Sequence, residues 1–346
     1  MKDFSIDGRK INENSYPLII PEIGINHNGS LKVAKKMIDA AARAGAEIIK
    51  HQTHVVEDEM SRHASKTIPG NSNKSIMEIM SSCCLSEEEE FELMKYTERK
   101  GLIFLSTPFS REAFRRLERF GVKAYKVGSG ECNNYPLLEL ISKTKKPTIM
   151  STGMNNISSI QKAVTIFKKN NCPLALMHTT NLYPTPDRLI RLGAMIEMRD
   201  AFPDLIYGLS DHSIDNLAAK TAISIGAMII ERHFTDTRKR KGPDIICSMN
   251  GSELKKLIED SKRIIEFRGG KKEAAKEEEV TKKFAFASIV SDKDIKKGEK
   301  FNLDNIWVRR PGTGDFLAED YQNILGRKAL RDISMGEQIK KQDVFK

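Results

Sequence analysis

Eight short apolar runs alternate with longer amphipathic stretches between residues 18 and 230. They cover residues 18–20, 47–49, 102–105, 124–127, 148–150, 174–177, 206–209 and 228–230. Such alternation is typical of βαβ units that build a parallel sheet. The runs begin about 30 residues apart, as expected for a complete barrel of roughly 250 residues rather than an open sheet. We therefore predict an α/β fold that contains a (β/α)₈ TIM barrel.

The second and third runs are separated by an insertion, residues 54–90, which holds Pro69-Gly70-Asn71 and a short helical pattern at 75–80. Long loops at the upper rim of a barrel often serve as lids or subunit contacts. An insertion without a function is equally compatible with the sequence.

A separate module is predicted after the barrel. A helical pattern at 252–267 is followed by residues 268–283, which are rich in Lys and Glu and too poor in apolar residues to build a core. In the tail, the pattern of residues 293–299 recurs at 331–337. We predict a barrel domain at 1–267, a linker at 268–283 and a small, mostly-β domain at 284–346. A module of this size is marginally stable alone, which favours docking onto its own or a neighbouring barrel.

Composition narrows the classes of partner. The net charge of +10 comes from 57 basic and 47 acidic residues, without the concentrated basic stripe typical of nucleic-acid binding. No apolar run approaches the roughly 18 residues that span a bilayer, and the N-terminus is not signal-like. The five cysteines form no CxxC pair, which indicates neither a disulfide framework nor a zinc knuckle. We expect a cytoplasmic protein that binds neither nucleic acid nor membrane.

Polar residues follow the ends of the predicted strands, where TIM barrels carry their active sites. They include Glu22, Lys50, Gln52, Thr107, Lys126, Ser129, Glu131, Ser151, Asn181, Ser210, His212 and His233. Helix capping would explain Ser151, Thr179 and Ser210. It explains the lysines and histidines poorly, because charged groups at such positions seldom lack a partner or a role. The sequence therefore predicts one polar cavity at the barrel mouth.

Two pairs within this set suggest particular chemistry. His212 and His233 follow neighbouring strands and could share one divalent ion with water, or could simply be hydrogen-bonded. Lys50 and Lys126 suit a phosphorylated carboxylate. A Schiff-base lysine, as in an aldolase, is the alternative.

The motifs at 21–29, 50–53, 106–109, 128–131, 151–154, 208–212 and 231–235 resemble those of bacterial N-acetylneuraminate synthases, and the tail resembles the antifreeze-like (SAF) domain of that family. The resemblance covers nearly the whole chain. It implies condensation of phosphoenolpyruvate with N-acetylmannosamine, carbon–oxygen cleavage and release of phosphate. Alternative acceptors are 6-deoxy-2,4-diacetamido sugars, which lead to legionaminic or pseudaminic acid. A non-catalytic carbohydrate-binding protein is the alternative from another class.

The resemblance also implies roles for individual residues. His212 and His233 would bind Mn²⁺, with Mg²⁺ or Co²⁺ as alternatives, and this ion would polarise the sugar aldehyde. Glu22 would stabilise a cation, accept a proton or orient a histidine. The residues matched to phosphoenolpyruvate binding are Lys50, Thr107, Lys126, Ser129, Ser151, Asn181 and Ser210. Those matched to the sugar or to the metal-bound water are Gln52, Glu131, Tyr183 and Asp244.

A contribution from a second subunit is implied as well. Arg310 matches an arginine that one subunit offers to the active site of its partner, with Arg309 as the alternative assignment. Phe284 would line the same pocket. The expected assembly is a homodimer with exchanged C-terminal domains.

Overall fold

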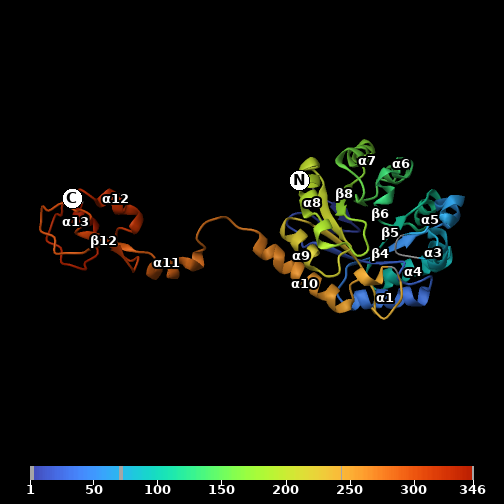
Figure 1. The fold of residues 1–346 in the computed structure, drawn as a ribbon, viewed down its shortest axis with the longest axis horizontal. Coiled ribbons are helices and arrows are strands. Elements are labelled where there is room, and N and C mark those ends of the chain that lie inside the picture. Colours follow the sequence, from blue (N-terminus) through green and yellow to red (C-terminus); the bar gives the residue numbers. More distant parts are fainter. Residues whose placement is uncertain (1–3, 70–72, 243, 345–346) are drawn as a thin grey trace. The chain divides into compact units, whose positions relative to one another are not determined.

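The structure is a computed structural model that describes residues 4–69, 73–242 and 244–344. The predicted turn residues Gly70 and Asn71 lie outside this range. The chain divides into two compact units between Gly269 and Gly270, and each unit is described by itself (Figure 1). None of the described helices combines the length and the apolar character needed to cross a bilayer.

Eight parallel strands close into a barrel in the order β10-β3-β4-β5-β6-β7-β8-β9. They are β3 (Leu18–Gly24), β4 (Ile48–Thr53), β5 (Ile103–Pro108), β6 (Tyr125–Val127), β7 (Thr148–Ser151), β8 (Leu174–Thr179), β9 (Ile206–Asp211) and β10 (Ile229–His233). Each strand overlaps one of the eight apolar runs. The predicted TIM barrel is therefore confirmed.

Helices surround the barrel (Figure 1). They are α1 (Leu31–Arg43), α4 (Glu87–Arg99), α5 (Arg111–Phe120), α6 (Tyr135–Lys143), α7 (Ile157–Lys169), α8 (Leu192–Ala201), α9 (Leu217–Ser224) and α10 (Gly251–Arg268). In α1, the Ser30 side chain caps the first turn by accepting from the Val33 N–H, and Ala34, Met37 and Ile38 face inward at helical spacing. The amphipathic stretches thus cover the outside of the barrel.

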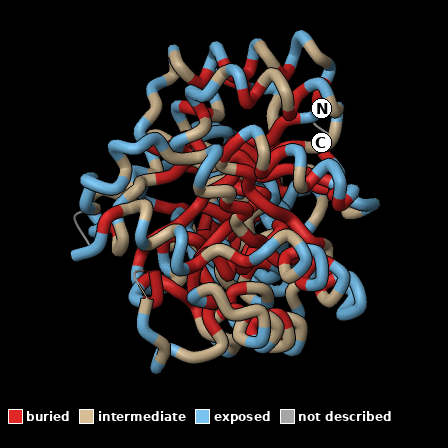
Figure 2. Tube along the Cα trace, turned by 90° about the vertical axis from the view of Figure 1, so that its right-hand side faces the viewer, coloured by how far each residue is buried: buried red, intermediate tan, exposed pale blue. Residues whose placement is uncertain are grey.

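Alternation along each strand divides its side chains between two cores. Ile48 packs inside the barrel, whereas the adjacent Ile49 packs in the layer beneath the helices. The buried residues accordingly gather in the centre of the barrel unit (Figure 2). Since burial of one large aliphatic side chain contributes roughly 1.5–3 kcal/mol, these two cores supply most of the stabilisation. The same alternation sends Lys50 and Gln52 into the barrel mouth.

A hairpin that the sequence reading did not predict precedes the barrel. It pairs β1 (Phe4–Ile6) with β2 (Arg9–Ile11). Its side chains Phe4, Ile6 and Ile11 join the cluster that contains Leu18 and Ile48, each the first residue of a barrel strand. The hairpin therefore packs against the N-terminal end of the barrel, opposite the polar strand ends.

The insertion between β4 and α4 contains short helices. They are α2 (Val56–Glu59), a 3-10 helix at Arg62–Lys66 and α3 (Ile76–Cys83). Ser75 and Glu78 cap α3 reciprocally. The helical pattern at 75–80 thus corresponds to α3, which extends further than that pattern.

The C-terminal unit has a small two-stranded sheet of β11 (Ser288–Ser291) and β12 (Ile306–Arg309). Its helices are α11 (Glu279–Ala285), α12 (Tyr321–Ile324) and α13 (Lys341–Val344). Helix α11 lies partly within the predicted linker 268–283 and buries no residue. The core of the unit consists of Ile289, Ile295, Phe301, Ile306, Phe316, Ile324, Ala329, Ile333, Ile339 and Val344.

The two copies of the repeated pattern pack against each other symmetrically. Asp294 accepts a hydrogen bond from the Met335 N–H, and Asp332 accepts the corresponding one from the Lys297 N–H, both at 2.8 Å. Each copy therefore caps the turn of the other, which explains why the aspartate and the turn recur together.

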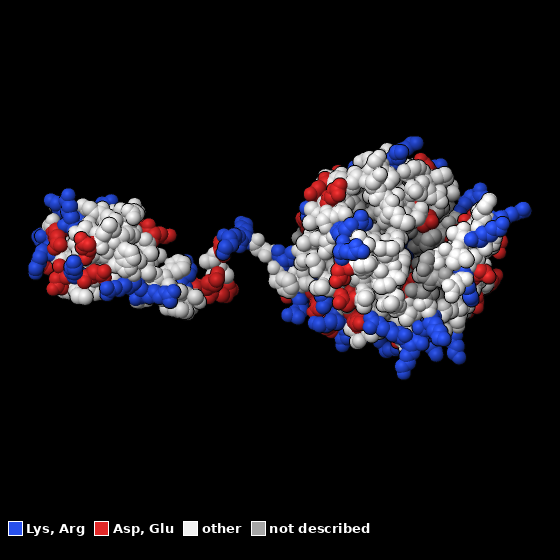
Figure 3. Space-filling view, viewed as in Figure 1, with Lys and Arg blue, Asp and Glu red and all other residues white. Residues whose placement is uncertain are grey.

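Charged side chains of both signs are intermingled over the visible face of the molecule (Figure 3). Lys and Arg are denser along the lower edge of the barrel unit, near α1, where Lys32 and Lys36 are exposed.

Candidate active site

Strand register sets the centre of the site. Glu22 on β3 lies opposite His233 on β10 and opposite Lys50 on β4. Glu22 Oε1 accepts from Lys50 Nζ, and also from Gln52 Nε2 at 2.6 Å. His233 Nε2 lies 3.6 Å from Glu22 Oε2. The strand turns at Gly24, whose φ of +46° favours glycine.

Four buried charges balance one another here. Burial alone would raise the pKa of Glu22, but Lys50 and His233 hold it well below its ordinary value. Burial alone would lower the pKa of Lys50, but Glu22 and Glu231 raise it. The pKa of Lys126 is lowered by burial, against an opposing effect of Glu231. Glu231 Oε1 lies 3.3 Å from Lys50 Nζ and 3.7 Å from Lys126 Nζ.

Hydroxyl and amide groups extend the site beyond the lysines. Ser151 Oγ accepts from Lys126 Nζ at 2.6 Å, and Ser129 Oγ accepts from the Gly153 N–H at 3.0 Å. An added Cβ at Gly153 would lie only 1.8 Å from Asn181 Oδ1. Glycine is thus required because the backbone approaches the Asn181 side chain closely.

Several buried polar atoms in the described part of the chain have no hydrogen-bond partner. At this site they are Thr107 Oγ1, Glu131 Oε2, Thr179 Oγ1, Asn181 Oδ1, Glu231 Oε2 and His233 Nδ1. Folded proteins leave few such atoms unpaired, so a concentration of them indicates a place for a polar ligand or water.

His212 and His233 face each other with ring centroids 5.4 Å apart. His212 Nδ1 donates to the Thr180 carbonyl at 2.9 Å. Burial and the neighbouring His233 lower the pKa of His212 to about 3, so its ring is neutral and Nε2 keeps a lone pair. His233 Nδ1 lies 3.7 Å from Asp244 Oδ2.

These donors fit a divalent cation. A neutral imidazole whose other nitrogen is fixed by a carbonyl or carboxylate is the usual form of a metal-bound histidine. The described residues contain no group of three or more His, Cys, Asp or Glu side chains arranged to hold a metal ion. An ion held by this pair would therefore complete its coordination shell with water and substrate oxygens.

Two further carboxyl groups have raised pKa values. Burial and the nearby Glu59 raise the pKa of Glu131 to about 7. Burial also raises the pKa of Asp244. Tyr183 stacks on His212 with ring centroids 4.1 Å apart. These carboxyl groups are suited to hydrogen bonding with sugar hydroxyls, whereas the two lysines are suited to an anion.

One cavity of about 270 Å³ brings most of the predicted residues together. Those that line it are Glu22, Lys50, Gln52, Lys126, Ser129, Glu131, Ser151, Asn181, Tyr183, Ser210, His212 and His233. Thr107 lies beside it on β5, opposite Gln52, and Asp244 lies beside His233. Phe284 and Arg310 belong to the C-terminal unit.

The sequence analysis assigned no role to four residues that line this cavity, namely Phe109, Met154, Thr179 and Glu231. Glu231 is the most important omission because it contacts both lysines. The sequence does indicate that Glu231 faces the cavity. It precedes His233 by two positions on β10 and therefore shares the inward face of that strand.

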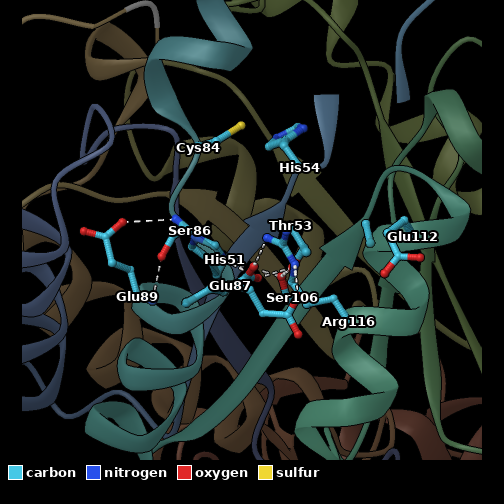
Figure 4. Close-up of polar contacts among 12 residues, drawn as sticks. His51, Thr53, His54, Cys84, Ser86, Glu87, Glu89, Ser106, Glu112 and Arg116 are labelled. Carbon is cyan, nitrogen blue, oxygen red and sulfur yellow. Dashed lines mark hydrogen bonds and ion pairs between the residues drawn. The ribbon is translucent and has the colours of Figure 1, made fainter. Parts of the chain in front are cut away.

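The outward face of β4 is anchored by a second buried network (Figure 4). Glu90 on α4 accepts from Thr53, lies 3.3 Å from His51 Nδ1 and accepts from Arg116 of α5 at 3.1 Å. Burial alone would raise the pKa of Glu90, but His51, Thr53 and Arg116 lower it. This network thus holds the strand that carries Lys50 and Gln52 on the face opposite the cavity.

Fold and cavity together define a (β/α)₈-barrel enzyme with buried cations and a histidine pair at its mouth. Residues 37–273 match the NeuB family, and residues 286–344 match the SAF domain. The chain therefore belongs to the NeuB family of phosphoenolpyruvate-condensing synthases, with a C-terminal SAF domain, as the motifs predicted. Enzymes of this family generally use a divalent metal ion.

Named relatives are synthases of different products. The chain is 36% identical over 331 residues to an N,N'-diacetyllegionaminic acid synthase of Campylobacter jejuni, covering 93% of this chain and 98% of the relative. It is 34% identical over 339 residues to a pseudaminic acid synthase of that organism, covering 96% and 98%. A solved N-acetylneuraminic acid (sialic acid) synthetase from Leptospira borgpetersenii, in complex with citrate, is 31% identical with a TM-score of 0.74, covering 81% of this chain and 95% of that chain.

Proposed function

We propose that the protein is an N-acetylneuraminate synthase that condenses phosphoenolpyruvate with N-acetylmannosamine. Carbon 3 of phosphoenolpyruvate bonds to the aldehyde carbon of the open-chain sugar, whose oxygen becomes a hydroxyl. Water adds to the cationic carbon 2, and phosphate leaves with cleavage of its carbon–oxygen bond. The observation that carries the proposal is the placement of Glu22 between Lys50, Gln52 and His233 at the mouth of a NeuB-family barrel.

Phosphoenolpyruvate would lie on the lysine side of the cavity. Lys50 and Lys126 offer ammonium groups, and Ser129, Ser151 and Asn181 offer hydroxyl and amide groups. Thr107 and Ser210 would complete this set. An anion placed here would offset the two buried cations, which Glu22 and Glu231 balance in its absence.

Glu22 would stabilise the cation that develops at carbon 2 of phosphoenolpyruvate. Its lowered pKa keeps it ionised at neutral pH. A carboxylate with so low a pKa is a weak base, which favours electrostatic stabilisation over proton removal.

His212 and His233 would bind the divalent ion, for which Mn²⁺ is the first candidate. The ion would supply Lewis-acid polarisation of the sugar aldehyde. Tyr183, stacked on His212, would restrict that ring to one orientation. Asp244, close to His233 Nδ1, would orient the second ring or meet a metal-bound water.

The acceptor would lie against Gln52 and Glu131. The buried Glu131 Oε2 has no partner among the described residues and calls for a hydroxyl donor. N-acetylmannosamine offers more hydroxyl groups than a 6-deoxy-2,4-diacetamido sugar, and this difference supports it as the acceptor. Phosphate release from phosphoenolpyruvate, measured with each sugar in turn, tests both the reaction and the acceptor. Release with a diacetamido sugar alone would reassign the acceptor, and release with none would overturn the proposal.

A Schiff-base aldolase is the second candidate function. It needs a lysine with a lowered pKa, and the pKa of Lys126 is lowered. Borohydride with substrate would trap such an intermediate on Lys126 and block activity. The synthase should instead lose activity on chelation and regain it with Mn²⁺. Covalent trapping at Lys126 together with activity that survives chelation would favour the aldolase.

The assembly would be a homodimer with exchanged C-terminal domains. Arg309 is paired with Asp292, whereas Arg310 is exposed and makes no hydrogen bond or ion pair with any described residue. This difference supports Arg310 as the residue offered to a partner. Phe284 is also exposed, at 60%. All five cysteines are free thiols, which agrees with a reducing compartment such as the cytoplasm.

A further inference from the structure

The Gln52 carboxamide lies between the central carboxylate and a histidine from the start of the insertion. Gln52 Nε2 donates to Glu22 Oε1 at 2.6 Å, and Gln52 Oε1 lies 3.1 Å from His54 Nε2. His54 Nδ1 lies 2.8 Å from Glu59 Oε2 at the end of α2. The four side chains thus form one continuous chain from the insertion to Glu22.

Donor and acceptor chemistry fixes the direction of both hydrogen bonds that the Gln52 side chain makes. Gln52 Nε2 donates to Glu22 Oε1, so the amide oxygen faces His54. That oxygen only accepts, so His54 Nε2 must carry a hydrogen. The Glu59 carboxyl group faces the other ring nitrogen and holds the ring in this orientation.

Burial and packing hold this histidine in place. The side chain of His54 is 4% exposed, and its ring stacks on Phe109, which lines the cavity, at 4.4 Å with an interplanar angle of 9°. Helix α2 is held in turn, because Asp58 accepts from the Glu112 N–H at the start of α5 at 2.7 Å. The imidazole therefore has little freedom to turn away from Gln52.

We propose that His54, held by Glu59, is a positioning residue that keeps the NH₂ group of Gln52 directed at Glu22. The proposal rests on the function proposed above for Glu22. Without the His54 N–H, the amide loses the partner of its oxygen and can rotate, which would turn that oxygen toward the Glu22 carboxylate. The start of the insertion would then help to position an active-site residue.

His54→Phe tests the proposal because it keeps an aromatic ring against Phe109 and removes both ring nitrogens. We expect kcat to fall roughly 10–100-fold, as is usual when a partner that orients a reacting or binding group is lost. The KM for phosphoenolpyruvate should change little, since the lysines are untouched. The matched control is His63→Phe, an exposed histidine of the same insertion, which should keep wild-type kinetics.

Glu59 provides a conservative pair. Glu59→Gln can donate to Nδ1 of a neutral His54 that still donates from Nε2 to Gln52, so activity should be largely kept. Glu59→Leu cannot form a hydrogen bond with His54 Nδ1, so its kcat should fall as in His54→Phe. Wild-type kcat in both His54→Phe and Glu59→Leu would overturn the positioning role.

Nitrogen-15 NMR of histidine-labelled protein gives a readout that does not need turnover, with the His54 signals assigned by their loss in His54→Phe. His54 Nε2 should carry hydrogen in the wild type and should keep it in Glu59→Gln. A bare Nε2 in the wild type overturns the inference even if the enzyme is active. Absence of phosphate release from the wild type would overturn the proposed function and leave this NMR result to decide the His54–Gln52 contact.

Discussion

Glu131 shows how one partly buried side chain can serve binding at the cost of stability. Its raised pKa of about 7, against 4.5 for an ordinary Glu, means that the folded state favours the protonated form. The stability linked to this group is present below about pH 4.5 and is lost as pH rises toward 7. Glu131→Gln should remove that loss. Because the side chain is only partly buried, we expect the variant to be about 1–2 kcal/mol more stable than wild type at pH 8.

Urea unfolding at pH 4 and pH 8 measures this difference. The stability gain of Glu131→Gln should be larger at pH 8, whereas its KM for the sugar should rise because the carboxyl group is lost. A gain that is equal at both pH values would show that Glu131 has no raised pKa in the folded protein.

Gly153 tests how closely the backbone packs at the anion side of the cavity. In Gly153→Ala the new methyl group must displace Asn181, so affinity for phosphoenolpyruvate should fall at least about tenfold, equivalent to about 1.4 kcal/mol. Gly193→Ala is the control, because a Cβ there meets nothing within 4 Å and Gly193 does not line the cavity. Titration calorimetry with phosphoenolpyruvate compares the two. Equal affinity in both variants would contradict the close approach of Gly153 to Asn181.

Most of the residues that line the cavity could be predicted from the sequence, but their pKa shifts could not. Lys50 and His212 follow recognisable strands, so position along the chain placed them at the barrel mouth. The direction of each pKa shift depends on neighbours that only the closed barrel brings together, as Glu231 is brought to Lys126. The partners of Gln52 likewise emerge only when the strand and the insertion pack.

At the scale of elements, the two faces of β4 have different surroundings. Lys50 and Gln52 face the cavity, while His51 and Thr53 face Glu90. Such division follows from the two-residue period of a strand. A change on the outer face should therefore affect folding first and catalysis only through the position of the strand.

Arg116→Ala tests the outer face. It removes a partner of the buried Glu90 carboxylate, and we expect a loss of about 2–3 kcal/mol in the free energy of unfolding, since His51 and Thr53 remain. Arg115→Ala, an exposed neighbour 3.6 Å from Glu112, should cost less than about 0.5 kcal/mol. Urea denaturation measures both. Equal losses would mean that Glu90 does not depend on Arg116.

The elements that could be predicted were those with a strong local pattern. Eight apolar runs and the pattern of α10 identified the barrel, because periodic burial is recorded directly in the sequence. The hairpin of β1 and β2 could not be predicted, because a strand of three residues is too short to show the alternation of apolar and polar residues. Helix α2 is similar, since it has four residues and buries none of them.

At the scale of the whole molecule, the repeated pattern of the tail was visible in the sequence but its meaning was not. Asp294 and Asp332 each cap the turn of the other copy, which no local pattern could reveal. The unit they stabilise has a small core, and units of this size gain from docking. Mixing two inactive variants tests whether a tail completes the active site of its own barrel or that of a partner subunit.

Two inactive chains should restore activity to each other if the tails are exchanged. We expect His212→Ala to abolish turnover through loss of a metal ligand, and Arg310→Ala to weaken sugar binding severely. In a mixed dimer with exchanged tails, the intact barrel of the Arg310→Ala chain receives the intact tail of the His212→Ala chain. One of its two sites is then wholly wild type.

After the two variants are unfolded together and refolded as a mixture, activity should recover to about a quarter of the wild-type level, because random pairing makes half of the dimers mixed and each has one intact site. If every tail serves its own barrel, both sites of a mixed dimer carry a defect and no activity returns. Arg309→Ala in place of Arg310→Ala is the control for the assignment. The Arg309→Ala variant should be active by itself, without the His212→Ala chain, since Arg309 is already paired with Asp292 in its own unit.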